Sequence, residues 1–279
     1  MSSYNFNNFT FRVKNFLKLA IKYLLMLLPN FILKNSFFFN KKFYYKKKGF
    51  NNWENFFFSG EQNFVKKNSK KKFDYALDIG ANIGDFSKML IREFDRNCKI
   101  YALEPQEGCL KYLKKLKFKY NNFNYFNYAI SNNNGFSHIY FETKNSQVAS
   151  LLKSEKLKTS WSKNDKIYSN LVKTINFDTL YKKIGIKKNH NLFIKIDTEG
   201  LEVELLKNFF NKKLAFSEIL FELDQLNALK ICKFLEELNK KVNFILYILL
   251  PFNYGIKRIS ISYLKKELKY CNLLIRNNS

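Results

Sequence analysis

Acidic side chains stand at the ends of four predicted buried strands, where an α/β enzyme places its chemistry. In a doubly wound sheet, ligands bind outside the carboxyl ends of the strands, so we expect these side chains to converge on one crevice. A carboxylate there can accept hydrogen bonds from the hydroxyls of a ribose, or can take a proton as a general base. The four residues are Asp78, Glu104, Asp197 and Glu222.

The loop "GANIG" (80–84) follows the first of these strands and opens a helix. A dinucleotide fingerprint, G-x-G-x-x-G, needs a second glycine so that the backbone can approach a pyrophosphate. Asn82 replaces that glycine, and its side chain would stand where the diphosphate lies. The loop therefore favours a nucleoside cofactor without phosphates over NAD or FAD.

Glu104 gives such a cofactor a partner, because it ends the second strand, 24 residues after Gly80. Its two oxygens can accept both hydroxyls of a ribose. The loop and the acid together predict S-adenosyl-L-methionine; the alternative is a tight strand–helix turn that binds no ligand. The expected cofactor-binding residues are Asp78, Gly80, Asn82, Gly84, Glu104, Ala129 and Ser131.

Individual roles within this set are partly open. Asp78 is expected to reach the methionine amino group or to fix the loop. Asn82 is expected to bind the methionine carboxylate or to orient the loop. The segment 128–131 is expected beside the adenine, with plain core packing as the alternative.

The segment "IKIDTEG" around Asp197 supplies the residues expected on the acceptor side. Methyl transfer to a hydroxyl requires that the oxygen lose its proton, so Asp197 is the first candidate for a catalytic base. Glu199 is the second, as base or substrate clamp. Lys195 shares a strand face with Asp197; it is expected to pair with a carboxylate and tune its pKa, or simply to neutralise the acidic site. Thr198 and Glu222 are expected to bind the substrate.

Metal chemistry is only weakly indicated. Asp197, Glu199 and Glu222 could hold Mg²⁺ or Ca²⁺ through their oxygens, so a divalent metal is possible but is not predicted. The chain has two histidines, which excludes a histidine-rich site, and His190 is expected in a loop at the amino end of its strand. The four cysteines have neither a CxxC pair nor metal-ligand spacing, so we expect reduced structural thiols.

Several segments, in this order, resemble the FkbM family of S-adenosylmethionine-dependent methyltransferases. They are "DIGANIGDFS", "YALEPQ", "NYAIS…G", "TINFDTL" and "FIKIDTEGLEVELLKN", over about residues 59–223, with a weaker echo in the closing "NLLIRN". The "IKIDTEG" block is the specific part. The resemblance implies a Rossmann-like methyltransferase fold and usually O-methylation, often of a sugar or polyketide hydroxyl. It implies nothing about the first 58 residues.

Alternating strands and helices must position these residues, so we expect an α/β, Rossmann-like, doubly wound and mainly parallel sheet. The late segments could be antiparallel edge strands. Ser59 with Gln62 fits a capping box that starts a short helix near Gly60, and Asp178 is expected to cap another helix. The predicted strands are 75–79, 99–104, 123–130, 137–142, 171–177, 192–197, 218–223, 242–249 and 271–277; the helices lie near 84–95, 107–118, 200–209 and 226–239.

A basic arm precedes this domain. The chain has 279 residues and a net charge of +26, and residues 1–72 hold 15 Lys and Arg against two acids. We expect a helical arm over 1–58 and the methyltransferase domain over 59–279. Lysines at 14, 18 and 22 form one stripe of a helix over 11–28 that is otherwise apolar. Such a helix lies in a membrane interface or docks on its own domain; its longest apolar run is too short to span a bilayer.

The leading functional hypothesis is an O-methyltransferase acting on a sugar, as part of a surface glycan or lipid-linked saccharide. The arm suggests a cytoplasmic enzyme with peripheral contact to an anionic membrane surface. Alternatives are an RNA or other nucleic-acid methyltransferase, which the charge and aromatics would suit, and a non-catalytic nucleoside-binding scaffold. No nucleic-acid partner is expected, because the chain has neither an "NPPY"-type base-flipping sequence nor an evident RNA-binding module. The high charge could also reflect AT-rich coding DNA, and the oligomeric state is not predicted.

Overall fold

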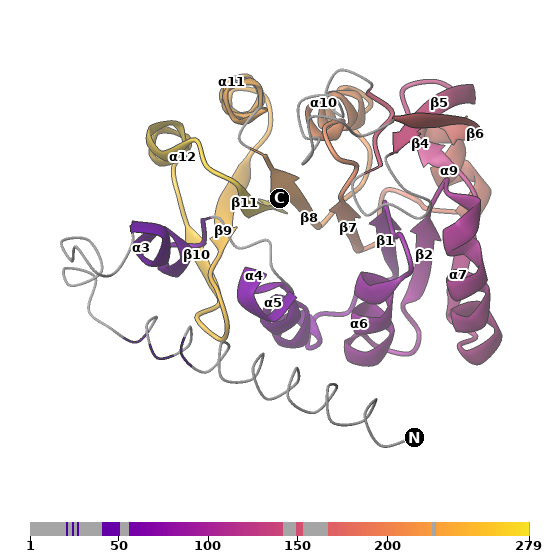
Figure 1. Cartoon of the computed structure of the whole chain (residues 1–279), viewed down its shortest axis with the longest axis horizontal. Coiled ribbons are helices and arrows are strands. Elements are labelled where there is room, and N and C mark those ends of the chain that lie inside the picture. The colour runs from indigo at the N-terminus through magenta and orange to yellow at the C-terminus, as the bar shows by residue number, and fades with distance from the viewer. Residues whose placement is uncertain are drawn as a thin grey trace, which may run out of the picture.

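The main body of the protein is an eight-stranded sheet with helices on both faces (Figure 1). The computed structural model describes residues 21, 24, 27, 41–50, 56–141, 149–152, 167–224 and 227–278. The sheet order is β10-β9-β11-β8-β7-β1-β2-β3. Its strands are β1 (Tyr75–Ile79), β2 (Lys99–Leu103), β3 (Phe123–Phe126), β7 (Leu192–Ile196), β8 (Glu218–Leu223), β9 (Phe244–Leu249), β10 (Ile256–Arg258) and β11 (Cys271–Asn277).

Five strands that are adjacent in this sheet, β8, β7, β1, β2 and β3, pair in parallel. This confirms the predicted doubly wound, mainly parallel sheet. Strands covered on both faces read as nearly continuous apolar runs, and all five residues of both β1 and β7 are buried. Side chains alternate between the two faces. Each face therefore has its own hydrophobic core, and the polar residues Asp78 and Lys195 in these strands are exceptions that need partners.

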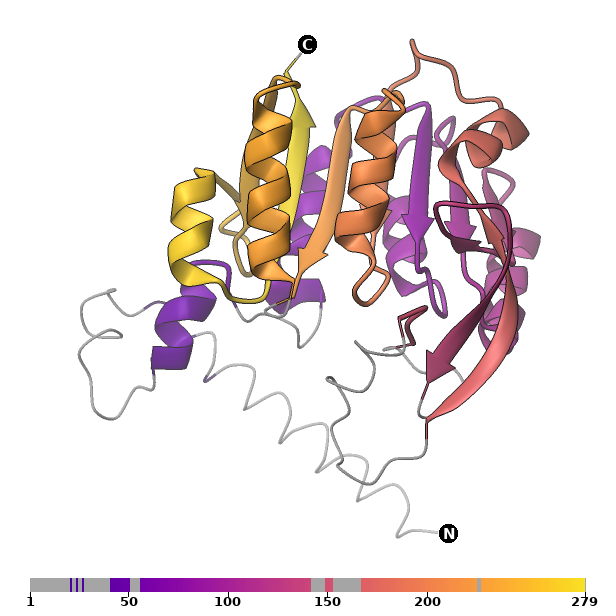
Figure 2. The same ribbon diagram turned by 90° about the horizontal axis from the view of Figure 1, so that it is seen from above.

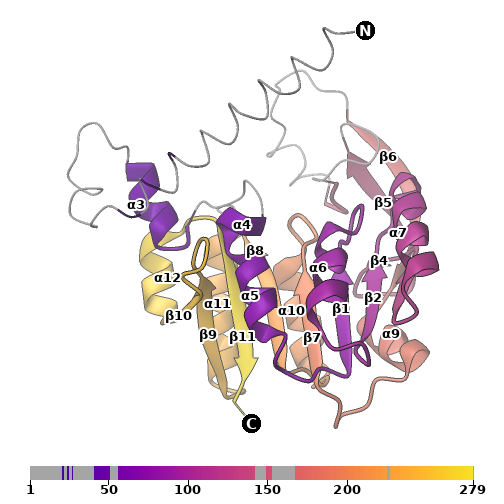
Figure 3. The same ribbon diagram turned by 90° about the horizontal axis from the view of Figure 1, so that it is seen from below.

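Two sets of helices cover these faces. One core packs beneath α9 (Phe177–Ile184), α10 (Glu202–Asn211) and α11 (Ala228–Asn239), seen in front of the sheet in Figure 2. The other packs beneath α5 (Glu61–Asn68), α6 (Asp85–Glu93) and α7 (Glu107–Lys119); Figure 3 shows α5 and α6 in front of the sheet. Most of these helices lie close to their predicted positions.

The last strands differ from the prediction of antiparallel edge strands. β11 is antiparallel, but it lies inside the sheet, between β8 and β9. Its residues Leu273, Leu274 and Ile275 are all buried, so both of its faces are covered, as an interior strand requires. The edge is the short β10, which was not predicted, and neither was α12 (Ile261–Glu267) between β10 and β11.

A second, three-stranded sheet lies beside the main one (Figure 1). The single strand predicted over 123–130 is wrong, because it divides into β3 and β4 (Ala129–Ile130), which belong to different sheets. At the break, the Asn127 side chain donates hydrogen bonds to the carbonyls of Glu104 and Pro105. β4 pairs with β6 (Tyr168–Ile175), which pairs in turn with β5 (Gly135–Phe141).

Two predicted helix caps are wrong. Gly60, with φ 86°, precedes α5, and the Ser59 hydroxyl donates to the Glu61 carboxylate instead of capping the helix with Gln62. α9 is capped by Asn176, whose side chain accepts from the Thr179 N–H. Asp178 lies in the first turn, where an acid is favoured by the helix dipole.

Parts of the basic arm pack on the domain. α3 (Lys41–Lys47) and α4 (Phe56–Ser59) were not predicted; after α3, Phe50 is fully buried and pairs with Cys271 in an isolated bridge. Of the helix expected over 11–28, only three residues are described. Ile21, Leu24 and Leu27 are helical and 56%, 62% and 53% exposed; the rest lies outside the described residues. Within the described ranges, no helix is both long and apolar enough to span a bilayer.

Candidate active site

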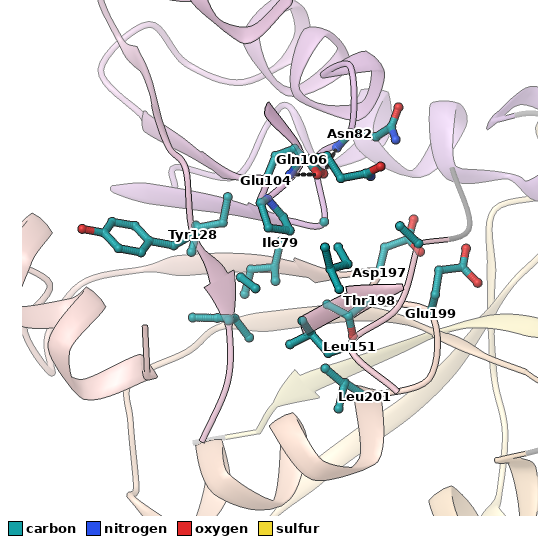
Figure 4. Close-up of a pocket in the computed structure, with 17 residues that line it drawn as sticks. Ile79, Asn82, Glu104, Gln106, Tyr128, Leu151, Asp197, Thr198, Glu199 and Leu201 are labelled. Carbon is teal, nitrogen blue, oxygen red and sulfur yellow. Dashed lines mark hydrogen bonds between the residues drawn. The ribbon is translucent and has the colours of Figure 1, made fainter. Parts of the chain in front are cut away.

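A pocket opens at the carboxyl ends of β1, β2 and β7, and the small sheet forms its far wall (Figure 4). The lining combines carboxylates with an apolar wall. Three acids line it: Glu104, Asp197 and Glu199. The other lining residues are Gly80, Asn82, Pro105, Gln106, Thr198 and the apolar Ile79, Leu103, Tyr128, Ala129, Ile130, Ile139, Ala149, Leu151 and Leu201.

The glycine loop after β1 packs directly on the loop after β7. Gly80 has φ 82°, and a Cβ atom built there would lie 1.8 Å from the carbonyl oxygen of Asp197. Glycine is therefore needed at this position for two reasons: the backbone is left-handed, and there is no space for a Cβ atom. Asn82 is also left-handed, with φ 49°, a conformation that asparagine tolerates. Its Oδ1 accepts from the Ile83 N–H, so it helps to shape the loop.

Glu104 ties the end of β2 to this loop. Its carboxylate accepts hydrogen bonds from the backbone N–H of Asn82 at 2.7 Å and of Gln106 at 2.8 Å. Burial raises the pKa of Glu104 to about 7, although both N–H donors oppose the shift. Each carboxylate oxygen retains further acceptor capacity, so the group on the pocket wall can still receive a ribose hydroxyl.

Asp78 lies outside the pocket lining, in the core beneath α6. Its Oδ2 accepts from the Ser87 hydroxyl of α6 at 2.5 Å, and burial raises its pKa to about 6. Of the two roles that the sequence left open, this contact matches that of fixing the loop–helix unit.

Gly84 and Ser131 also do not line the pocket, whereas Ala129 does. Gly84 allows close packing instead, because a Cβ atom there would meet the side chains of Leu113 and Leu116 at 2.8 Å. Ser131 donates its backbone N–H to the carbonyl of Ile175, at the end of the small sheet. The adenine side predicted over 128–131 is therefore represented in the lining by residues 128–130.

The loop after β7 is held in an unusual conformation. Glu199 has φ 54° and Gly200 φ 114°. The Glu202 carboxylate accepts from the backbone N–H groups of Thr198 and Gly200, both at 2.9 Å, and from the Thr198 hydroxyl at 3.0 Å. Ser150 adds a bond to the carbonyl of Glu199 at 2.7 Å. The helix dipole alone would account for an acid at the start of α10, so sequence reasoning missed the role of Glu202 in holding the loop.

Lys195 does pair with a carboxylate, as the sequence predicted. Its Nζ lies 2.6 Å from Oδ2 of Asp197 and 3.6 Å from Oε1 of Glu61, and 4.9 Å from the ring centre of Phe86. Burial lowers the pKa of Lys195, but the surrounding carboxylates, Asp197 foremost, outweigh it and raise the pKa. The Lys195 side chain is 3% exposed and that of Asp197 27%, so the lysine lies behind the aspartate and not in the pocket lining. Glu61 was missed, and its only sequence signal is an acid at a helix start.

Glu222 is also outside the pocket lining. It is a residue of β8, and its Oε1 accepts from the Tyr270 hydroxyl at 2.7 Å. Burial, and next the charge of Asp197, raise the pKa of Glu222 well above its ordinary value. The predicted substrate-side residues therefore divide into Asp197, Thr198 and Glu199 at the pocket and Lys195 and Glu222 behind it. No group of three or more metal-ligating side chains is arranged to hold an ion in the described part of the chain.

A second cavity, of about 540 Å³, lies at the opposite, amino edge of the sheet. His190 lines it, in the loop before β7, where the sequence placed it. The buried carboxylate of Glu218 accepts hydrogen bonds there from Asn68, Lys71 and Arg276. This cavity is far from the carboxyl ends of the strands, where the predicted site residues lie.

The pocket fits a phosphate-free nucleoside cofactor. An apolar wall that includes Leu103, Tyr128 and Ile139 can cover a base, and Glu104 can receive ribose hydroxyls. The described lining residues include neither lysine nor arginine.

Comparison with known proteins gives a family match over residues 78–247, to the "Methyltransferase FkbM domain". Among solved structures, the chain is similar to methyltransferase FkbM from Methylobacillus flagellatus KT, with 13% identity and a TM-score of 0.42 over 73% of this chain and 43% of that one. It is also similar to an O-methyltransferase from Bacillus cereus in complex with SAH, with 11% identity and a TM-score of 0.42 over 77% and 79%. The chain thus spans less than half of the Methylobacillus protein. No curated protein matches it.

The family match covers more than half of the chain and includes the glycine loop, Glu104 and the segment around Asp197. It confirms the resemblance drawn from the sequence motifs. The chain belongs to the FkbM methyltransferase domain family.

Proposed function

We propose that this enzyme methylates a hydroxyl group of a sugar, in a surface glycan or a lipid-linked saccharide. The observation that carries the proposal is the sign of charge in the pocket. The whole chain has a net charge of +26, yet the described pocket lining contains Glu104, Asp197 and Glu199 and neither lysine nor arginine. Carboxylates accept hydrogen bonds from neutral sugar hydroxyls, whereas they repel the phosphates of a nucleic acid.

Asp197 is the proposed catalytic base. S-adenosylmethionine would be held by the glycine loop and Glu104 and would supply the methyl group from its positively charged sulfur, which would keep the electron pair of the carbon–sulfur bond when the acceptor oxygen takes the carbon. The hydroxyl proton passes to the Asp197 carboxylate, which reaches solvent with 27% of its side chain exposed and can release the proton there. Thr198 and Glu199, on the same loop, orient the acceptor, and Lys195 holds Asp197 from behind.

We also propose that the arm binds an anionic membrane surface, where lipid-linked acceptors would lie. Ile21, Leu24 and Leu27 are spaced by three residues in a helix and are each more than half exposed, so they form an apolar stripe. Lysines at 14, 18 and 22 in the sequence supply positive charge for anionic lipids.

Membrane binding by the arm is tested by co-sedimentation with vesicles of phosphatidylcholine and phosphatidylglycerol at low salt. A protein in which Ile21, Leu24 and Leu27 are all serine should remain in the supernatant, and equal binding by both proteins would reject the arm's role.

The acceptor is tested by transfer of a labelled methyl group from S-adenosylmethionine into fractionated cell extract. We expect label in the glycan or lipid-linked saccharide fraction, resistant to nuclease and released by mild acid. Asp197→Asn should abolish incorporation and leave cofactor binding intact. Asp95→Asn, the same change at an exposed site outside the pocket lining, is the matched control. Label that nuclease releases from RNA would replace the sugar acceptor by a nucleic acid, and full activity of Asp197→Asn would remove Asp197 as the base.

A further inference from the structure

A row of charged side chains lies behind Asp197, on the face of the sheet beneath α5 and α6; Asp78, Lys195 and Glu61 are buried there and Glu222 is half-buried. Asp78 of β1 is directly opposite Lys195 of β7 in the strand register, and Glu222 is on the adjoining β8. The residues two positions earlier on these three strands belong to the core beneath α5 and α6, so the charged residues point to the same face. Glu61, the first residue of α5, reaches this row from above.

The acids of the row differ in their partners. Asp78 accepts from the Ser87 hydroxyl, and Glu222 accepts from the Tyr270 hydroxyl. Among the described residues, the carboxylates within 4 Å of the Lys195 ammonium group are those of Asp197 and Glu61. A single buried cation therefore serves two carboxylates, one that reaches the pocket and one that does not.

The chain orients Glu61 toward Lys195. The Ser59 hydroxyl donates to Oε2 of Glu61 at 2.6 Å, which leaves Oε1 on the side of the lysine. Gly60 between them has φ 86°, and a Cβ atom there would lie 2.0 Å from the carbonyl oxygen of Leu250, so the approach of α5 depends on glycine. Glu61 precedes the segment that matches the family, residues 78–247.

A buried ammonium group needs a counter-charge, because losing one partner of a buried ion pair leaves an uncompensated charge. When Asp197 takes the acceptor's proton, its carboxylate becomes neutral and no longer balances Lys195. Burial raises the pKa of Glu61 and Lys195 opposes this, while the charge of Asp197 raises it further. Neutralising Asp197 removes that last repulsion, so the carboxylate form of Glu61 is favoured when Lys195 needs it.

We propose that Glu61 is a positioning residue for methyl transfer: it is the second counter-ion of Lys195 and keeps the ammonium group charged and against Asp197 while Asp197 carries the acceptor's proton. The inference rests on the proposed function, in which Asp197 is the base. It gives the segment before β1 a part in the reaction, although Glu61 does not itself touch the pocket.

The first experiment compares Glu61→Gln with Glu61→Asp and with Glu107→Gln. Glu107 is the matched control, because it is also the first residue of its helix but is exposed. In Glu61→Gln we expect kcat to fall about tenfold, a part of what a positioned base contributes, with an unchanged Kd for S-adenosylmethionine. The acidic limb of the kcat profile should move to lower pH, since a negative charge near the base is removed. Glu61→Asp should recover part of the rate, and Glu107→Gln should match the wild type.

A second readout does not depend on the acceptor. In protein labelled with ¹⁵N-lysine, a buried ammonium group in slow hydrogen exchange gives an NMR resonance, which Lys195→Arg would assign to Lys195 by its loss. In Glu61→Gln we expect this resonance to shift and to be lost by exchange at a lower pH than in the wild type. A resonance with the same shift and pH range in both proteins would overturn the proposal, as would a folded Glu61→Gln with the wild-type kcat and pH profile. An active Asp197→Asn would instead show that the assigned base is wrong, so the two failures are distinguishable.

Discussion

Gly80→Ala tests the close approach of the two loops that form the pocket floor. A left-handed φ of 82° costs a non-glycine residue roughly 1–2 kcal/mol. The added Cβ would lie 1.8 Å from the carbonyl oxygen of Asp197, and real Cβ contacts stay above 3.0 Å, so the loops must separate by about 1.2 Å. A displacement of about 1 Å at a catalytic site can cost about a hundredfold in rate.

We therefore expect Gly80→Ala to lower the free energy of unfolding by about 2–4 kcal/mol, from backbone strain and loop displacement together. Methyl transfer should fall about a hundredfold, because Asp197 moves with its carbonyl. Urea unfolding measures the first effect, and label transfer at saturating S-adenosylmethionine measures the second.

Gly185→Ala is the matched control. Gly185 has a similar φ of 77°, but an added Cβ would meet no atom within 4 Å. It should therefore show the conformational cost alone, about 1–2 kcal/mol, with unchanged transfer. If both variants lose equal stability and Gly80→Ala keeps its activity, the contact between the loops does not constrain the pocket.

Two further substitutions test the buried carboxyl groups of Glu202 and Asp78. Glu202→Gln places an amide where a carboxylate accepts three bonds from the loop at 198–200, so we expect a loss of about 1–3 kcal/mol in stability and reduced transfer; Glu204→Gln, an exposed acid in the same helical turn, should change neither in the same assays. Asp78 has a folded-state pKa of about 6 against an ordinary value of 3.8. Because the pKa is raised on folding, protonated Asp78 favours the folded state, and its contribution is lost as pH rises from about 4 through 6. The free energy of unfolding of Asp78→Asn, measured by urea unfolding, should therefore increase relative to that of the wild type by up to about 3 kcal/mol between pH 4 and 7. An identical pH dependence of stability in both proteins would contradict the raised pKa of the buried Asp78 carboxyl.

The sequence pattern predicted the central strands and helices well, because the residues that specify each of them are close together in the sequence. The buried runs "YALDI" and "LFIKI" do not have the spacing of apolar and polar residues that an amphipathic helix requires. Each run is followed by a loop that leads into a helix. The second sheet was missed because the sequence between 123 and 130 carries no break signal as strong as glycine or proline. The break depends on Asn127, whose side chain bonds to the backbone that follows β2.

The candidate site was predicted to a similar extent. Carboxylates that follow parallel strands must meet at one edge of the sheet, so Glu104 and Asp197 were found from position alone. Which acids reach the pocket was not predictable, because it depends on the pleat and on the elements packed above. Asp78 of β1 and Glu222 of β8 flank β7 and point to the face beneath α5 and α6, where each is bonded to a hydroxyl group; Asp78 is buried and Glu222 is half-buried.

The sequence by itself determined the class of fold, the phosphate-free character of the cofactor loop and the family, because these depend on residue types at short spacing. Tertiary structure alone decided that the small sheet walls the pocket, that Glu202 holds the loop of Asp197, and that Glu61 shares Lys195 with Asp197. Glu61 and Asp197 are 136 residues apart in the chain. Their meeting requires the packing of α5 on the sheet, and no local periodicity specifies which distant acid will approach a buried lysine.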